Sequence, residues 1–211
     1  MDVLEYNNKN AALVLVQPVD DHDLEGMENE IRTIRSLSEA DFHLIAVRVD
    51  NWNRDLSPWP APAVFGNDDF KGGAAAFLEE VLKLCQDDGK TYLLGGYSLA
   101  GLFALWAAYQ TDRFAGIAAA SPSVWFPGFV DCMRENAIKS GAVYLSLGDR
   151  EERTKNPVMA TVGDCIREGH DILKAQNIKC TLEWNSGNHF RDADLRTAKA
   201  FAWLMNERFS K

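Results

Sequence analysis

The stretch Gly95-Gly96-Tyr97-Ser98-Leu99-Ala100-Gly101 is the most informative part of this sequence. It follows a short apolar run, Thr91 to Leu94, and leads into an apolar segment of helical character, Leu102 to Ala108. A serine between a strand and a helix, with small residues two positions before and after it, has the sequence form of a nucleophile elbow. The turn is sharp, so larger side chains at positions 96 and 100 would collide with the neighbouring backbone. The pattern predicts that Ser98 stands at the start of a helix, whose positive end favours developing negative charge.

The motif departs from its familiar form at one position. G-x-S-x-G is usual, and here Ala100 stands in place of the second glycine, with Gly101 one residue later. The simpler alternative is a buried serine packed in a glycine-rich strand end. The strand before Ser98 and the helix after it favour the elbow.

Composition indicates one globular domain. The 211 residues include 46% hydrophobic and 25% charged side chains, which is ordinary for a globular protein. We expect a single domain over residues 1–211 with no separate lid domain. The formal net charge of −9 disfavours nucleic acid and anionic membranes as partners, because phosphate binding relies on clustered lysine and arginine.

The sequence also bears on the cellular compartment. The N-terminal residues lack the basic and apolar regions of a signal peptide, and no segment approaches the length of an apolar membrane span. The cysteines, Cys85, Cys132, Cys165 and Cys180, form no C-x-x-C pair, so we expect reduced thiols in a cytoplasmic protein.

Apolar runs alternate with helical patterns along the chain. Six runs are predicted to be strands: residues 11–16, 43–49, 91–97, 116–120, 142–147 and 180–184. Apolar side chains at helical spacing predict helices within residues 24–34, 74–85, 98–108, 156–173 and 195–205, with Asn156-Pro157 at the start of the fourth. Strands alternating with helices predict an α/β fold, with a mostly parallel sheet of about six strands and helices on both faces.

One connection is long and aromatic. Residues 51–73 show no clear periodicity and contain two tryptophans, two phenylalanines and three prolines. Such a loop is too aromatic for disorder. Two interpretations stay open: it lines or covers a pocket at the strand ends, or it is a rigid surface loop that covers the core.

A serine hydroxyl needs a base within hydrogen-bond reach, and His189 is the best placed of the histidines. It lies in a turn between the last predicted strand and the last predicted helix, which is where the base falls in the nucleophile-acid-base order of such hydrolases. His22, His43 and His170 occupy a loop, a strand start and a polar stretch of helix.

The acid should follow the fifth predicted strand, where Gly148-Asp149-Arg150-Glu151-Glu152 offers three carboxylates. Hydrolases of this type often place the acid three residues after the glycine that ends the strand, which selects Glu151. Asp149 is the first alternative and Glu152 the second. Each could instead be solvated or paired with Arg150 or Arg153.

The oxyanion hole needs two backbone N–H groups. One is predicted to be that of Leu99, directly after the nucleophile. The other should come from the loop after the first predicted strand, where Pro18 has no N–H, so Val19 or Asp20 is expected, and the sequence does not decide between them.

Four segments together carry a family resemblance: Arg54-Asp55-Leu56-Ser57-Pro58, the elbow, Ser121-Pro122-Ser123-Val124-Trp125-Phe126 and Gly187-Asn188-His189. They resemble the esterase D and enterochelin-esterase-like group of the α/β-hydrolase superfamily, from about Ala11 to the end of the chain. In that group R-D-L-[ST]-P and S-P-S-x-W-[WF] accompany the elbow. The resemblance implies an α/β-hydrolase fold and a serine esterase mechanism, with Ser98 and His189 matching the nucleophile and the base. Ala100 departs from the group's pattern, and the acid is not matched; some relatives rely on a Ser-His pair without a clear acid.

The expected activity is hydrolysis of a carboxylic ester, with a small-molecule ester as partner and without a metal or organic cofactor. Trp125 and the aromatic residues of 51–73 are expected to shape an apolar pocket, unless Trp125 simply packs under the site. The alternatives are an inactive hydrolase-like binding scaffold and an acyltransferase or peptidase that uses the same residues.

Overall fold

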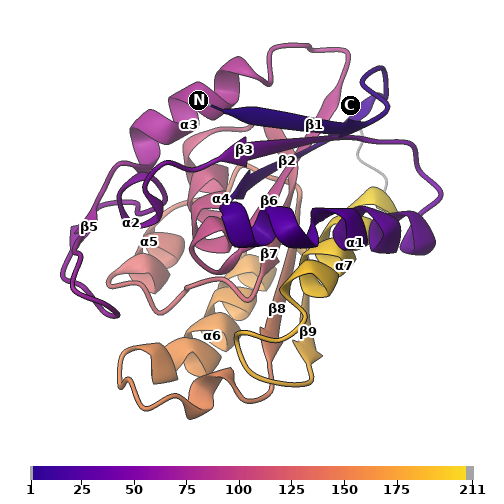
Figure 1. The fold of residues 1–211 in the computed structure, drawn as a ribbon. Helices are drawn as coiled ribbons and strands as arrows, with labels where there is room; N and C mark the ends of the chain where they lie inside the picture. Colours follow the sequence, from indigo (N-terminus) through magenta and orange to yellow (C-terminus); the bar gives the residue numbers. More distant parts are fainter. Residues whose placement is uncertain (1, 208–211) are drawn as a thin grey trace.

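A seven-stranded sheet forms the centre of the computed structural model, which describes residues 2–207 (Figure 1). The strands lie in the order β1-β3-β2-β6-β7-β8-β9. All neighbours are parallel except β1, which pairs antiparallel with β3 at the edge. The bounds are β1 Val3–Asn7, β2 Leu13–Val19, β3 His43–Arg48, β6 Thr91–Tyr97, β7 Phe114–Ala120, β8 Ala142–Gly148 and β9 Lys179–Asn185.

The six predicted strands are all present, and the expected α/β architecture is confirmed. The additional strand β1 was not predicted from the sequence. Its five residues include no continuous apolar run, because an edge strand is buried on less of its surface, and each of its residues is half-buried or exposed.

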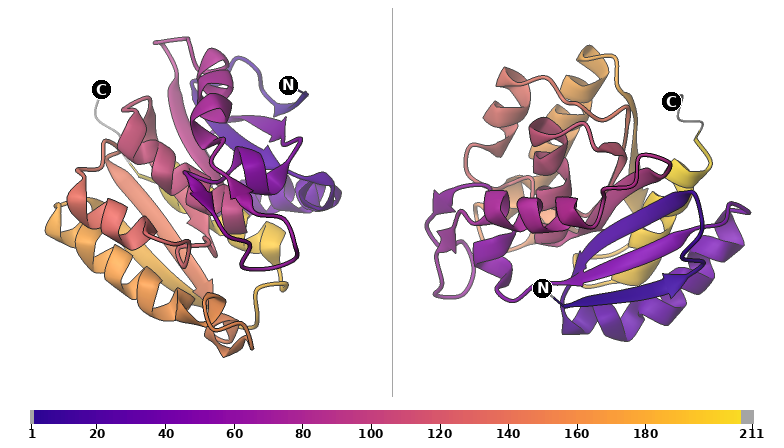
Figure 2. Two further views of the ribbon diagram at one scale, coloured as in Figure 1. Left: turned by 90° about the vertical axis from the view of Figure 1, so that its left-hand side faces the viewer. Right: turned by 90° about the horizontal axis from the view of Figure 1, so that it is seen from above.

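Helices cover both faces of the sheet, as the two views of Figure 2 show. The helix pair α1 and α7 packs on one face, and the remaining long helices pack on the other. Their bounds are α1 Asp21–Leu37, α3 Ala74–Lys83, α4 Ser98–Gln110, α5 Phe129–Glu135, α6 Val162–Ala175 and α7 Ala193–Met205. Within the described residues, no helix combines the length and apolar character that crossing a membrane requires.

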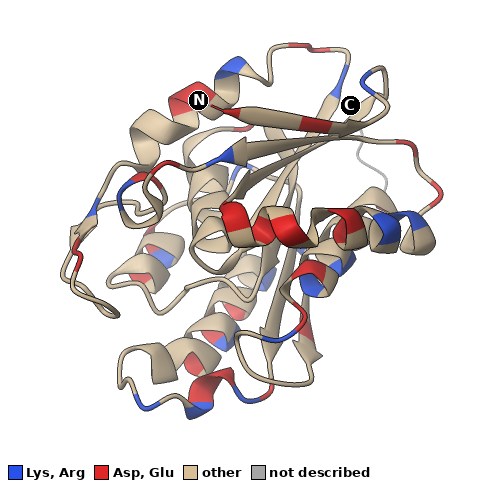
Figure 3. Ribbon diagram, in the orientation of Figure 1, with Lys and Arg blue, Asp and Glu red and all other residues tan. Residues whose placement is uncertain are grey.

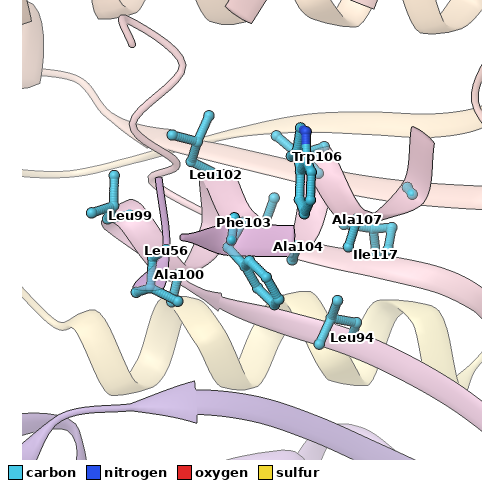
Figure 4. Packing of buried hydrophobic residues seen from close by; sticks show 14 of the residues in the cluster. Leu56, Leu94, Leu99, Ala100, Leu102, Phe103, Ala104, Trp106, Ala107 and Ile117 are labelled. Carbon is cyan, nitrogen blue, oxygen red and sulfur yellow. The ribbon is translucent and has the colours of Figure 1, made fainter. Parts of the chain in front are cut away.

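Helix α4 holds the candidate nucleophile and is the most deeply buried helix. Every residue from Leu99 to Tyr109 is buried, so the helix is apolar all round rather than on one face. In Figure 4, Phe103 and Trp106 pack among apolar side chains that include Leu94 of β6 and Ile117 of β7. This packing holds the first turn of α4 rigidly against the end of β6.

The connection of residues 51–73 contains short elements: α2 (Trp52–Asp55) and a hairpin of β4 (Pro60–Ala61) and β5 (Phe70–Lys71). Its aromatic side chains pack on the segment after β7. Phe65 lies edge-on to Trp125, with ring centroids 6.1 Å apart, and Phe70 lies 5.1 Å from Phe126 in the same way. Trp59 Nε1 donates a hydrogen bond to the Pro127 carbonyl at 2.9 Å. The loop therefore supports the segment that carries Trp125.

The helix predicted from Asn156 begins later than the sequence suggested. The Asn156 side-chain oxygen accepts the N–H groups of Val158 and Met159, at 3.0 and 3.2 Å. A 3₁₀ turn, η2 (Met159–Thr161), follows, and the α-helix α6 starts at Val162. The prediction of a helix start at Asn156-Pro157 was wrong because the asparagine side chain bonds the backbone locally and closes a tighter turn first.

Helix α1 shows how charge supports the local structure. Acidic side chains lie between Asp21 and Glu30, and the basic Arg32 and Arg35 follow toward the C-terminal end, which suits the helix dipole (Figure 3). Asp20 and Asp23 form a capping box at its start, each side chain accepting the other's backbone N–H. The box fixes the turn directly after β2.

Candidate active site

Ser98 lies at a strained turn between β6 and α4. Its φ is +56°, in the left-handed region that a side chain bearing a Cβ rarely adopts. A Cβ added at Gly96 would lie only 2.6 Å from the Cβ of Ala100. Positions 96 and 100 therefore share one space, and the glycine at 96 leaves room for the alanine that departs from the familiar motif.

His189 lies in the loop between β9 and α7. Its Nε2 is 3.0 Å from the Ser98 hydroxyl oxygen, and its side chain is 23% exposed, so part of the ring reaches the solvent. The ring packs against Tyr97, the residue before Ser98, with centroids 5.1 Å apart. The Tyr97 hydroxyl also donates to the His189 carbonyl at 2.7 Å, which ties the histidine loop to the end of β6.

Glu151 begins a 3₁₀ turn, η1 (Glu151–Arg153), directly after β8. Its Oε2 lies 2.7 Å from Nδ1 of His189, and its side chain is only 3% exposed. Oε1 accepts hydrogen bonds from the Gly148 N–H at 2.7 Å and the Ser121 hydroxyl at 2.8 Å. Burial pushes the pKa of the Glu151 carboxyl upward, but the bonds from His189, Gly148 and Ser121 outweigh it and hold that pKa below its usual value. The carboxylate is therefore ionised at neutral pH.

The other acid candidates lie elsewhere. Asp149 accepts the Gly187 N–H at 2.8 Å and so braces the histidine loop without contacting the ring. Glu152 pairs with Arg167 at 3.2 Å on the surface of α6. The structure thus brings Glu151, and neither alternative, to His189.

The other histidines lie away from the elbow. His43 pairs with Glu5 across β3 and β1 at 2.9 Å, and His22 lies 3.6 Å from Glu25 on α1. His170 lies near the middle of α6.

Two predicted oxyanion donors occupy ends of neighbouring elements. Leu99 is in the first turn of α4, where backbone N–H groups have no partner within the helix. Val19 is the last residue of β2, the strand that pairs with β6, and its carbonyl accepts the Val49 N–H at 3.0 Å. The alternative, the Asp20 N–H, already donates to Asp23 in the capping box.

Four further side chains surround the three predicted residues: Tyr97, Ser121, Ser123 and Arg196. Ser123 places its Oγ 3.4 Å from the Ser98 Oγ, and its backbone N–H donates to the Ser98 carbonyl at 3.0 Å. Arg196 is 1% exposed and its Nη1 donates to Glu151 Oε1 at 2.8 Å. The S-P-S motif was a usable signal for the two serines, whereas no motif marks Arg196.

A cavity of about 260 Å³ opens beside His189 and Glu151. Its lining residues combine apolar ones, among them Trp125, Met159 and Phe190, with Arg150 and Arg153. Trp125 thus lines the cavity itself. Within residues 2–207, no group of three or more His, Cys, Asp or Glu side chains is arranged to hold a metal ion.

The chain matches no family model, and no curated protein matches it in sequence. Its fold does match solved structures. An IroE-like serine hydrolase from Shewanella oneidensis superposes with a TM-score of 0.73 at 16% identity, over 96% of this chain and 75% of that one. The siderophore hydrolase EstA from Aspergillus nidulans gives 0.66 at 21% identity, over 94% and 83%.

The enterobactin esterase FES from Shigella flexneri gives a TM-score of 0.62 at 14% identity. The match covers 96% of this chain but only 55% of that larger protein. All three proteins are hydrolases by name, and at these identities the likeness is one of fold. The mostly parallel sheet with helices on both faces therefore has an α/β-hydrolase fold.

Proposed function

We propose that this protein is a serine hydrolase that cleaves a carboxylic ester through an acyl-enzyme intermediate. The observation that carries the proposal is the hydrogen-bonded line from Ser98 Oγ through the His189 ring to Glu151 Oε2, with distances of 3.0 and 2.7 Å. A nucleophile, a base and a group that orients the base in one line are what acyl transfer requires.

In the proposed reaction, Ser98 Oγ attacks the ester carbonyl while His189 Nε2 accepts the hydroxyl proton. The ionised Glu151 stabilises the imidazolium and holds Nδ1–H toward itself, so that Nε2 faces the serine. His189 then donates the proton to the leaving alcohol. Water attacks the acyl-enzyme with His189 again as base, and the Ser98 hydroxyl is restored.

The tetrahedral intermediate needs donors for its oxyanion. We assign one to the Leu99 N–H, which lies at the N-terminus of α4 where the helix dipole favours negative charge. The second is proposed to be the Val19 N–H at the end of the adjacent strand, because the Asp20 N–H is engaged by Asp23.

The cavity beside His189 suits one arm of a small ester. About 260 Å³ with an apolar wall of Trp125, Met159 and Phe190 would accept a short acyl or aryl group. Names of structural neighbours describe siderophore and enterobactin hydrolysis in those proteins, so esters of that kind belong in a substrate panel. We also propose that one domain carries all of this machinery without a separate lid.

A fluorophosphonate probe tests the proposal directly. It should add one covalent label, located at Ser98 by mass spectrometry, and Ser98→Ala should abolish both the label and the turnover of short-chain activated esters. Labelling without ester turnover would favour an acyltransferase or peptidase. Absence of both would favour the alternative of an inactive binding scaffold.

A further inference from the structure

A buried arginine on α7 contacts the predicted acid, the residue before the predicted nucleophile and the loop that carries His189. Arg196 is 1% exposed and lies in the first turn of the helix. Its Nη1 donates to Glu151 Oε1 at 2.8 Å and lies within hydrogen-bond distance of the Ser121 hydroxyl, at 3.0 Å, and the Tyr97 hydroxyl, at 3.1 Å. No sequence motif marks it.

The same guanidinium also holds the histidine loop. Nη2 donates to the backbone carbonyls of Ser186 and Asn188, at 3.3 and 3.1 Å. These two residues lie three positions and one position before His189 in the same loop. One planar group thus bonds the acid on one loop and the backbone beside the base on another, which only the fork geometry of an arginine allows.

Burying such a charge is costly unless it is paired, and Arg196 is paired with the equally buried Glu151. The two carboxylate oxygens of Glu151 have separate partners. Oε1 receives Arg196, Gly148 and Ser121, and Oε2 is left to His189. Because Oε1 is held on one side, the carboxylate cannot rotate away from the imidazole.

We propose that Arg196 is a positioning residue that fixes the Glu151 carboxylate with Oε2 toward His189 and holds the histidine loop against it. It acts through Glu151 and touches neither Ser98 nor the substrate cavity. The inference rests on the proposed function, because a fixed acid matters to catalysis only if Ser98 reacts.

The test compares Arg196→Met, which removes the charge at similar length, with Arg196→Lys, which keeps the charge but loses the fork. With Arg196→Met, kcat should fall by ~10²-fold with little change in KM, since misplacement of catalytic groups by a distant change has effects of that size. The acid limb of the pH–activity profile should steepen toward a slope of two, because loss of a neighbouring cation favours protonation of the Glu151 carboxylate, which then titrates as a second group beside the base. Arg196→Lys should recover the pH profile but only part of kcat.

Lys199→Met is the matched control. Lys199 lies one turn further along α7, pairs with Glu183 at 2.6 Å, and makes no contact with Ser98, His189 or Glu151. Its loss should leave kcat and the pH profile unchanged. If Arg196 had only a structural role, Arg196→Met would lower the melting temperature and the fraction of labelled enzyme, and the pH profile of the remaining enzyme would stay unchanged. That result would overturn the proposal.

A double-mutant comparison covers the case in which Arg196→Met folds poorly. In a Glu151→Gln background, Arg196→Lys should lower kcat by less than ~3-fold further, because residues that act as a unit are not additive. Full additivity would contradict action through Glu151.

Carbon NMR can measure the pKa of the Glu151 carboxyl directly, so it tests the positioning role independently of the proposed enzymatic function. The pKa of the Glu151 carboxyl, held low in the wild type, should rise in Arg196→Met whether or not the protein turns over an ester. An unchanged Glu151 pKa would refute the positioning role. An inert Ser98 with a raised Glu151 pKa would refute the enzyme assignment alone.

Discussion

Nδ1 of His189 lies 2.7 Å from Oε2 of Glu151, although the two residues are 38 positions apart in the chain. They come from the loops that follow β9 and β8, which are adjacent parallel strands. The pairing register places Gly148 opposite Asn185, so both strands end at the same level. The side chains just beyond them meet for that reason, and Ser98 lies on the same edge at the end of β6.

The first prediction concerns the identity of the acid. Glu151→Gln should lower kcat by ~10²–10⁴-fold, because a neutral amide neither fixes the required tautomer of the histidine nor stabilises the imidazolium. Steady-state kinetics with an activated ester measures the effect.

Asp149→Asn and Glu152→Gln provide the controls. Asp149 accepts the Gly187 N–H, so Asp149→Asn should lower kcat by less than ~10-fold. Glu152 pairs with Arg167 at the surface, so Glu152→Gln should leave kcat almost unchanged. If Asp149→Asn were the more damaging change, the acid would be Asp149, the first alternative from the sequence.

The second prediction is the pH dependence of kcat/KM. The base must be neutral to accept the Ser98 proton, and histidine side chains change their charge between about pH 5 and 8. The pKa of Glu151 is held below its usual range, so this carboxylate stays ionised through that interval. A plot of log kcat/KM against pH should therefore fall with a slope of one toward acid. A flat profile from pH 5 to 8 would exclude an imidazole base, and a slope of two would show that a second group titrates.

The third prediction concerns the elbow. Gly96→Ala should destabilise the fold by about 1–3 kcal/mol, since the new Cβ would lie 2.6 Å from the Cβ of Ala100. Adding Ala100→Gly removes the clashing methyl group. Urea unfolding of the two single variants and the double variant should show a favourable coupling energy of about 1 kcal/mol. Additive effects would mean that positions 96 and 100 do not share the same space.

The fourth prediction uses Glu30, a buried residue of α1. Gln17 donates to its Oε2 at 3.3 Å, its Oε1 has no hydrogen-bond partner among residues 2–207, and burial raises the pKa of Glu30 to about 8. The folded protein holds this proton more tightly than the unfolded chain, so stability falls as pH rises from about 4.5 to 8. Between pH 5 and 8 the wild type should lose on the order of 3 kcal/mol relative to Glu30→Gln, which has no proton to release.

Urea unfolding at both pH values measures the Glu30 effect. Glu28→Gln, at an exposed position of the same helix, is the control and should follow the wild type at both pH values. Parallel behaviour of Glu30→Gln and the wild type would show that Glu30 is already ionised at pH 5.

Much of the fold could be predicted because its signals are local. Continuous apolar runs mark strands buried on both faces, and the elbow needs small residues within a few positions of Ser98. The edge strand β1 was not predicted because it is only partly buried and so has no continuous apolar run. The start of α6 was also missed because the Asn156 side chain competes for nearby backbone N–H groups.

The residues of the candidate site also differ in whether a local sequence signal marks them. Ser98 and His189 were predicted from their positions relative to strand ends. Spacing after Gly148 favoured Glu151 but left Asp149 and Glu152 as alternatives. Which carboxylate reaches the imidazole depends on how far each backbone turns after β8, and that depends on the packing of η1. Arg196 carries no local signal because its partners lie 8 to 99 residues away. Local sequence thus specified the elements and their order, while the hydrogen-bonded contacts of the site depend on strand register and helix packing between distant segments.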